Sequence, residues 1–158
     1  MYELIPDEKI AASMRYLIAA AKSEILISTF KIQRPTRRRA LALGSLLDLV
    51  CERSKAGVQV RFLMNWNDTF KGVAKTNAPV ASAFRAAGID VRYLQNTRCA
   101  HAKILICDRK AMIIGSHNWS VQAFTLNFEL SILIEDDVAV KSAIEIYSGA
   151  FEHAKKWL

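Results

Sequence analysis

Two stretches of the chain share one pattern: residues 54–63 read SKAGVQVRFL and residues 85–94 read RAAGIDVRYL. Each combines the end of a helix, an Ala-Gly pair and an apolar strand. Glycine suits the left-handed backbone that ends many helices, which predicts this role for Gly57 and Gly88. The repeated junction favours successive parallel strands joined by right-handed helical crossovers.

The N-terminal third continues this alternation of helix and strand. A helix is predicted to begin at Pro6-Asp7, with the Asp7 side chain as its cap, because an apolar stripe at helical spacing follows. The stripe consists of Ile10, Met14, Leu17, Ile18 and Ala21. Residues 24–30 (EILISTF) are typical of a buried strand, and a second helix is expected at 41–55 after the basic loop 31–39.

The middle of the chain contains the two strands of the repeated pattern, predicted at 58–64 and 89–94. Between them, residues 65–75 (NWNDTFKGVAK) are expected to form a polar and aromatic loop. A short helix is predicted at 79–87, closed by the second glycine of the repeat.

The C-terminal half changes in character. Residues 100–107 and 111–116 are apolar strands separated by three residues, and so short a connection predicts an antiparallel hairpin. Another strand is expected at 130–134, and a last helix after Asp136-Asp137, where carboxylates suit the positive end of a helix dipole. The apolar stripe of this helix is Val140, Ile144, Tyr147 and Phe151.

This order of elements predicts an α/β fold in which a mixed, mostly parallel sheet carries helices on both faces. The sequence contains no linker or low-complexity segment, so residues 1–158 are predicted to form a single domain. The 158 residues are 52% hydrophobic and 23% charged, which is a globular composition with enough core to fold without disulfides or structural metal.

Positive charge predominates. The chain has 22 Lys and Arg against 15 Asp and Glu, a formal net charge of +7. This excess favours an anionic partner such as nucleic acid, anionic lipid head groups or a phosphorylated small molecule, with simple solubility as the alternative.

The sequence also bears on location. Three cysteines without a CxxC motif argue against a disulfide framework. The first residues lack the basic-then-apolar order of a signal peptide, and no apolar run reaches the roughly 18–20 residues of a membrane span. A cytoplasmic location is expected, with an exported form as the alternative if a signal segment has been removed.

Residues 101–118, HAKILICDRKAMIIGSHN, carry the side chains best suited to chemistry. Side chains two apart in a strand share a face, so His101 and Lys103 are expected to point the same way. The hairpin turn would bring Ser116 and Asn118 back beside them. Their donors form a cationic pocket that fits a phosphate, and histidine, with a pKa near 6.5, is a suitable nucleophile or general acid and base.

Two further residues in this stretch have structural interpretations. Gly115 is expected to let a ligand approach the backbone closely. Asp108 lies about 16 Å along the strand from Lys103 and cannot touch the same ligand atom. We interpret Asp108 as a turn residue that bonds its own neighbouring backbone.

A lone HxK is common by chance, but the full pattern HxKx4Dx6GSxN specifies six positions, with a chance frequency on the order of 10⁻⁸ per start. In this pattern the chain resembles the phospholipase D superfamily, whose HKD signature is complete here. The matching residues are His101, Lys103, Asp108, Gly115, Ser116 and Asn118.

The resemblance implies a metal-independent reaction in which His101 attacks phosphorus and forms a phosphohistidine. A second motif histidine would protonate the leaving oxygen and later activate water. Lys103 and Asn118 would hold the phosphate oxygens, and Glu129, in NFELSIL, is expected to orient the histidine. The catalytic set predicted in this way is His101, Lys103, Ser116, Asn118 and Glu129.

Larger members of the superfamily carry two motifs, whereas this chain has one. His117 is expected to face away from the site, and His153 to be solvated on the last helix. The resemblance therefore implies a homodimer in which His101 of each subunit meets its counterpart at a shared site, as in the short bacterial nucleases of the superfamily.

Basic and aromatic residues in the loops around the motif are candidates for binding substrate, because they suit a phosphate backbone and stacked bases. The candidates are Arg37, Arg38, Arg39, Trp66, Lys71 and Arg98. The alternative is that the arginines form a solvated loop and that Trp66 belongs to the core.

No metal or cofactor is expected. A zinc site built from Cys99, His101 and Cys107 would need thiolates that an extended strand holds roughly 26 Å apart. The acidic run 135–137 fits the start of a helix better than a Mg²⁺ site.

Three functions are consistent with these patterns. The first is a nuclease that cleaves DNA or RNA, the second a lipid phosphodiesterase or phosphatidyl transferase, and the third a non-catalytic nucleic-acid-binding module. The intact His101 and Lys103 argue against the third, and the lack of an obvious amphipathic membrane helix argues against the second.

Overall fold

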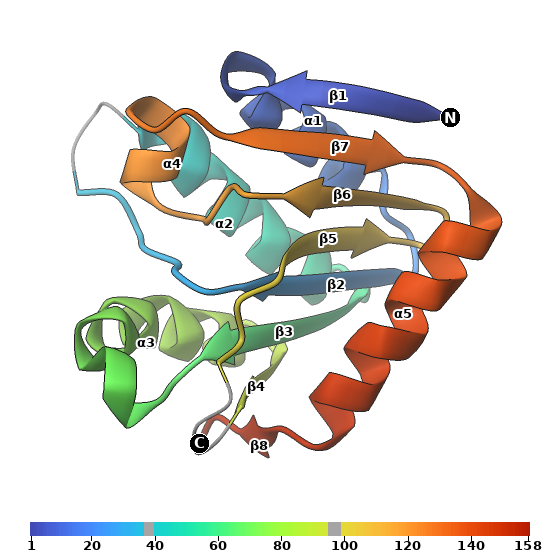
Figure 1. Cartoon of the computed structure of the whole chain (residues 1–158). Coiled ribbons are helices and arrows are strands. Elements are labelled where there is room, and N and C mark those ends of the chain that lie inside the picture. Colours follow the sequence, from blue (N-terminus) through green and yellow to red (C-terminus); the bar gives the residue numbers. More distant parts are fainter. Residues whose placement is uncertain (37–39, 95–98) are drawn as a thin grey trace.

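The computed structural model describes residues 1–36, 40–94 and 99–158 and contains one eight-stranded mixed sheet with helices on both faces (Figure 1). The strand order across the sheet is β1-β7-β6-β5-β2-β3-β4-β8. The strands are β1 (Tyr2–Pro6), β2 (Glu24–Thr29), β3 (Gln59–Asn65), β4 (Asp90–Leu94), β5 (Lys103–Cys107), β6 (Ala111–Gly115), β7 (Leu130–Ile134) and β8 (Lys155–Lys156).

Helices cover the two faces of the sheet unequally. The α-helices are α1 (Asp7–Ala20), α2 (Leu41–Lys55), α3 (Lys71–Ala86), α4 (Val121–Thr125) and α5 (Asp137–Glu152), and a 3₁₀ turn, η2, spans Asp68–Phe70. Residues of α1, α2 and α3 share the larger core on one face, whereas α5 packs on the other face (Figure 1). No helix within the described ranges is long and apolar enough to cross a membrane.

The local predictions are largely confirmed. Helix α2 has the expected bounds, and the stripes predicted for the first and last helices are buried. Gly57 and Gly88 follow their helices with φ of 96° and 87°, the left-handed backbone expected of them. The predicted hairpin is present, with Lys103 opposite Gly115 and Cys107 opposite Ala111.

The expectation of a mostly parallel sheet is wrong. Among the described residues, only β2, β3 and β4 are parallel neighbours, and the other five pairs of strands are antiparallel. Parallel neighbours need a long crossover, which the segments containing α2 and α3 supply. The short edge strands β1 and β8 were not predicted, and both add antiparallel pairs.

The predicted loop at 65–75 is also partly wrong, because α3 begins at Lys71 and contains Pro79. Asn67 starts this region by accepting a hydrogen bond from the Phe70 N–H. Farther along α3, the buried amide of Asn77 accepts from the Ile32 N–H at 2.8 Å and donates to the carbonyl oxygens of residues 30 and 65 at 3.0 Å. The helix therefore fixes the chain where it leaves β2 and β3.

Asp108 is a turn residue, as predicted, but its hydrogen-bond partners are different. It has φ of 52°, and its carboxylate accepts hydrogen bonds from the N–H groups of Lys22, Ser23 and Glu24 and from the Ser23 hydroxyl. Burial alone would raise the pKa of this carboxyl, but these hydrogen bonds lower the pKa to about 2. Asp108 thus joins the hairpin to the connection between α1 and β2.

Asp108→Asn is expected to lower the free energy of unfolding at neutral pH by about 1–3 kcal/mol, because a charged acceptor of several hydrogen bonds is lost. The native pKa lies below the value of about 3.9 for an unfolded aspartate. The stabilisation is therefore complete above about pH 4 and lost as the pH falls towards about 2. Urea unfolding across this range should show the two proteins converging at low pH. The exposed Glu135→Gln is the control, and an equally large effect there would contradict the assignment.

Candidate active site

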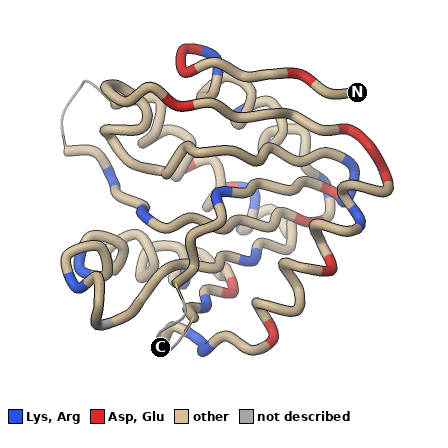
Figure 2. The backbone as a smooth tube through the Cα atoms, in the orientation of Figure 1, with Lys and Arg blue, Asp and Glu red and all other residues tan. Residues whose placement is uncertain are grey.

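The predicted catalytic residues lie where the central strands begin or end, on the left in Figure 1. We call this border of the sheet the catalytic edge; it is distinct from the edge strands β1 and β8. Because β5 and β7 run opposite to β2 and β6, the ends of β2 and β6 lie beside the starts of β5 and β7. Lys103 is opposite Gly115, which is opposite Ser131. The segment after β2 and the start of α3 bring basic residues to this same edge (Figure 2).

His101 and Lys103 are in direct contact. The Lys103 Nζ lies 2.9 Å from His101 Nδ1 and 3.2 Å from Nε2, and it donates to the His101 carbonyl oxygen at 2.7 Å. The exposed imidazole also lies against the ring of Phe30, with 4.9 Å between centroids. The strand begins at Lys103 and not at residue 100 as predicted, so His101 belongs to the segment that enters β5.

The surroundings favour a neutral imidazole. Burial and then the positive charge of Lys103 lower the pKa of His101 below its ordinary value. Burial also lowers the pKa of Lys103, while the neighbouring Cys99 and Glu129 oppose that shift. A neutral imidazole has the free electron pair that a nucleophile requires.

Asn118 is fixed at the end of β2. Its Oδ1 accepts hydrogen bonds from the Lys31 N–H at 3.1 Å and from the Thr29 hydroxyl at 3.3 Å. This arrangement leaves the two N–H groups of the Asn118 amide as donors for a substrate oxygen.

Ser116 and Gly115 hold β6 and β7 together: Ser116 through hydrogen bonds and Gly115 by leaving space for β7. The Ser116 Oγ accepts from the Leu130 N–H at 3.1 Å, and the Ser116 N–H donates to the Leu130 carbonyl oxygen at 3.1 Å. A Cβ on Gly115 would collide with the Leu130 carbonyl oxygen and the Ser131 hydroxyl. The approach of β7 therefore requires glycine at position 115.

The structure does not bring Glu129 into contact with His101. Glu129 is buried, its Oε1 accepts from the Asn127 amide at 2.8 Å, and its N–H donates to Asp7 at 2.8 Å. Within the described residues, no hydrogen bond or ion pair joins it to His101. The charge of Glu129 instead acts on Lys103 and on His117, where it favours the protonated forms.

Sequence reasoning missed the partners of His117. The side chain of His117 is buried on the face of the sheet that carries α1. Its Nδ1 lies 2.8 Å from the Ser131 hydroxyl and its Nε2 lies 3.2 Å from Asp7 Oδ1. Asp7 is thus the first residue of α1 and links this helix to the start of β7. The predicted capping role of Asp7 is wrong, because the cap residue of α1 is Pro6. No pattern in the sequence connects these distant residues.

The substrate-binding candidates have different outcomes. Arg37, Arg38, Arg39 and Arg98 lie outside the described residues. Lys71 is exposed at the start of α3.

Trp66 does not have the exposed ring expected of a stacking residue. It is half-buried and packs edge-to-face on Trp157 and Tyr93, with centroids 4.7 and 6.5 Å away. The aromatic side of the site is formed instead by Phe30, whose ring meets that of Phe70 at 5.2 Å.

An exposed imidazole beside an ammonium group and an amide, at the edge of a mixed sheet, is a site suited to a phosphate ester. The family model described as "Cardiolipin synthase, PLD-like domain" matches residues 14–153. The chain therefore belongs to the phospholipase D superfamily.

The chain is similar both to curated proteins and to solved structures. The chain is 29% identical over 146 residues to the mitochondrial cardiolipin hydrolase of Mus musculus, covering 92% of this chain and 59% of that protein. It spans about half the length of the curated relatives that it matches. In structure it resembles the phospholipase D family member Nuc from Salmonella typhimurium, with a TM-score of 0.80 and 18% identity over 99% of this chain and 96% of that one. NucT from Helicobacter pylori follows with 0.77 and 17% over 99% of both chains.

Proposed function

We propose that this protein is a metal-independent phosphodiesterase that cleaves DNA or RNA through a phosphohistidine in a homodimeric active site. The observation that carries the proposal is the contact between the exposed His101 ring and Lys103 within a complete HKD motif. Asn118 stands at the same edge with its amide fixed by backbone and hydroxyl donors.

The reaction has two displacements. His101 attacks phosphorus, so that an N–P bond forms as the P–O bond to the leaving group breaks. His101 of the second subunit must start as the imidazolium; it gives its extra proton to the leaving oxygen, becomes neutral, and then removes a proton from the water that cleaves the N–P bond. Lys103 and Asn118 stabilise the charge on the non-bridging oxygens.

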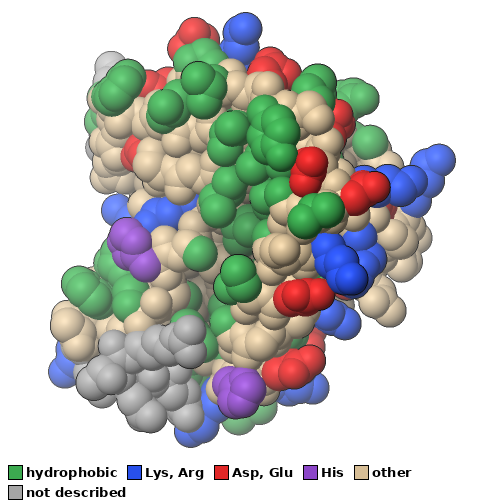
Figure 3. Space-filling view, turned by 45° about the vertical axis from the view of Figure 1, so that its right-hand side comes forward, with side chains coloured by type: hydrophobic (Ala, Val, Ile, Leu, Met, Phe, Trp, Pro, Cys, Tyr) green, Lys and Arg blue, Asp and Glu red, His purple; other side chains and the backbone are tan. Residues whose placement is uncertain are grey.

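An open apolar area supports self-association. On the face that carries α5, Leu4 of β1 lies opposite Ile132 of β7, which lies opposite Ile114 of β6. Leu4 and Ile114 are 65% and 37% exposed, and the nearby Phe128 is 93% exposed. Figure 3 shows hydrophobic side chains gathered over the upper part of the molecule. A second subunit docked near the site would cover such a surface.

Two observations bear on the substrate. The net charge of +7 favours a polyanion. The similarity to mitochondrial cardiolipin hydrolases makes a lipid phosphodiester the second candidate.

Incubation of the purified protein in EDTA with single-stranded DNA, double-stranded DNA, RNA and cardiolipin vesicles tests both. We expect cleavage of at least one nucleic acid, unchanged by EDTA, and dimers in sedimentation. If the protein cleaves cardiolipin and none of the nucleic acids, the proposed nuclease function is wrong and the protein is a lipid phosphodiesterase. Loss of activity in EDTA that Mg²⁺ restores would contradict the metal-independent mechanism.

A further inference from the structure

An exposed phenylalanine ring lies close to the proposed nucleophile. The Phe70 side chain is 43% exposed, and its ring meets the Phe30 ring edge-to-face with 5.2 Å between centroids. The Phe30 ring in turn lies 4.9 Å from the imidazole of His101. We propose that Phe70 stacks on a base of single-stranded nucleic acid next to the scissile phosphate, an inference that rests on the proposed nuclease function.

The position of the Phe70 ring suits this role. The Phe30 ring bridges Phe70 and His101, so a base flanking a phosphate bound at His101 can reach Phe70. An edge-to-face contact occupies at most one face of a ring, so Phe30 leaves at least one face of Phe70 uncovered. Bases of a single strand are free to stack on such a face, whereas those of a duplex are already stacked on one another.

Phe70 is held in place before a substrate binds. Its N–H donates to the Oδ1 of the buried Asn67 at 3.1 Å, and the Asn67 amide donates to the Asn65 Oδ1 at 3.3 Å. The half-buried Phe30 supports the ring from the end of β2. A side chain that is already ordered loses little conformational entropy when a base stacks on it.

Lysines lie at both ends of this pair of rings. Lys71 follows Phe70 directly, and Lys75 lies one turn later on the same face of α3; both are exposed. At the other end, the Lys103 Nζ lies 5.8 Å from the centroid of Phe30. Aromatic rings between ammonium groups are the arrangement that binds the bases and phosphates of a single strand.

The surroundings favour a base over a lipid surface. Of the large apolar side chains described in β3, η2 and α3, that of Phe70 alone is exposed. A membrane contact needs a wider apolar area than one ring among lysines.

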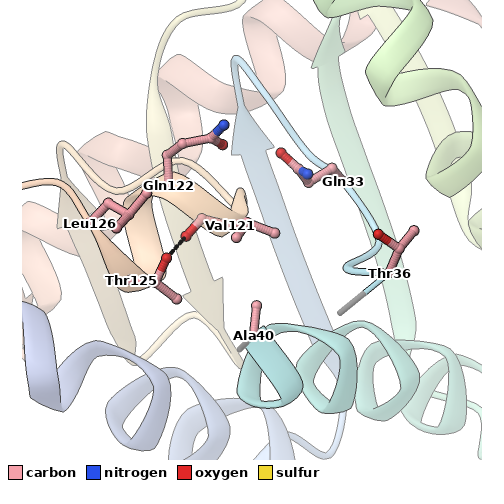
Figure 4. Close-up of a pocket in the computed structure, with 7 residues that line it drawn as sticks. All are labelled: Gln33, Thr36, Ala40, Val121, Gln122, Thr125 and Leu126. Carbon is pink, nitrogen blue, oxygen red and sulfur yellow. Dashed lines mark hydrogen bonds between the residues drawn. The ribbon is translucent and has the colours of Figure 1, made fainter. Parts of the chain in front are cut away.

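The other side of the segment after β2 offers a different surface. A cavity of about 460 Å³ lies there, beside α4 and the start of α2, whereas Phe70 lies on the side of α3 (Figures 1 and 4). The described residues that line this cavity have amide, hydroxyl and aliphatic side chains and include no aromatic ring. The bases of a bound strand are therefore expected on the side of Phe70.

The experiment compares cleavage of a single-stranded oligonucleotide with cleavage of the same strand built from stable abasic residues. We expect kcat/KM of the unmodified protein to be about 5-fold or more higher for the strand with bases. Phe70→Leu keeps an apolar side chain without the ring and should abolish most of this preference, whereas Phe70→Trp should preserve it. Tyr16→Leu is the matched control, because it removes a 70% exposed ring from α1, near the opposite border of the sheet.

The outcomes separate the two proposals. If neither strand is cleaved but cardiolipin vesicles are, the nuclease function is wrong. If the unmodified protein cleaves both strands equally, or if Phe70→Leu keeps the preference, the stacking role is wrong and the nuclease function stands. If Phe70→Leu keeps the preference but no longer sediments as a dimer or binds anionic vesicles, the ring is a subunit or membrane contact instead.

Discussion

His101→Ala is expected to lower kcat/KM by at least about 10⁴-fold on whichever phosphodiester the protein cleaves. In the proposed dimer, the substitution removes the nucleophile of one subunit and the acid of the other at the same time. Because His101 is exposed and precedes β5, the variant should fold and melt like the unmodified protein. Steady-state cleavage assays and thermal melting measure the two effects separately.

Two comparisons sharpen this test. His153→Ala removes an exposed imidazole at the end of α5 and should leave kcat/KM unchanged. Mixed dimers of His101→Ala and Lys103→Ala chains contain one intact imidazole, so full recovery of activity on mixing would contradict a reaction that needs both. Substantial turnover by purified His101→Ala would overturn the nucleophile itself.

Gly115→Ala should destabilise the fold by about 3 kcal/mol, although only one methyl group is added. The new Cβ would occupy the space of the Leu130 carbonyl oxygen and lie 2.5 Å from the Ser131 Cα. Backbone atoms of a neighbouring strand cannot rotate away, so β6 and β7 must separate. Ser116, which is bonded to Leu130, would move with them, and activity should fall as well. Urea unfolding measures the change in stability.

Gly149→Ala is the matched control for this substitution. Gly149 lies in α5, and an added Cβ meets no atom within 4 Å. Alanine there should raise the free energy of unfolding by about 0.5–1 kcal/mol, because it restricts the unfolded chain and favours the helix. If Gly115→Ala were as stable as the unmodified protein, the close approach of β7 would not be what requires glycine.

The features that the sequence predicted well depend on local interactions. Gly57 and Gly88 mark helix ends through their own backbone preferences, and the hairpin follows from a connection too short to do anything else. Because the hairpin register is local, the sequence could also place Ser116 and Asn118 at the same end of the hairpin as His101 and Lys103. The residues of the HKD motif lie within this hairpin and directly beside it, so their spacing could also be interpreted from the sequence.

The features that it missed depend on contacts between distant segments. The order of the strands cannot be obtained from periodicity, so the share of parallel pairs was overestimated. Strand β1 is defined by its pairing with β7, and α3 extends back to Lys71 across what reads as a polar loop. The link between Asp7 and Glu129 joins the start of α1 to the start of β7 and has no signature in either segment.

The attachment of Asp108 to the start of β2 means that the residues of the HKD motif have two different roles. In the proposed mechanism its histidine and lysine carry out the reaction, whereas its aspartate, at the far end of β5, stabilises the fold. Relatives that no longer catalyse a reaction should thus be free to lose the histidine and the lysine while still depending on the aspartate. A relative that retains this aspartate without the histidine and the lysine would be a protein that has lost catalysis and kept the fold.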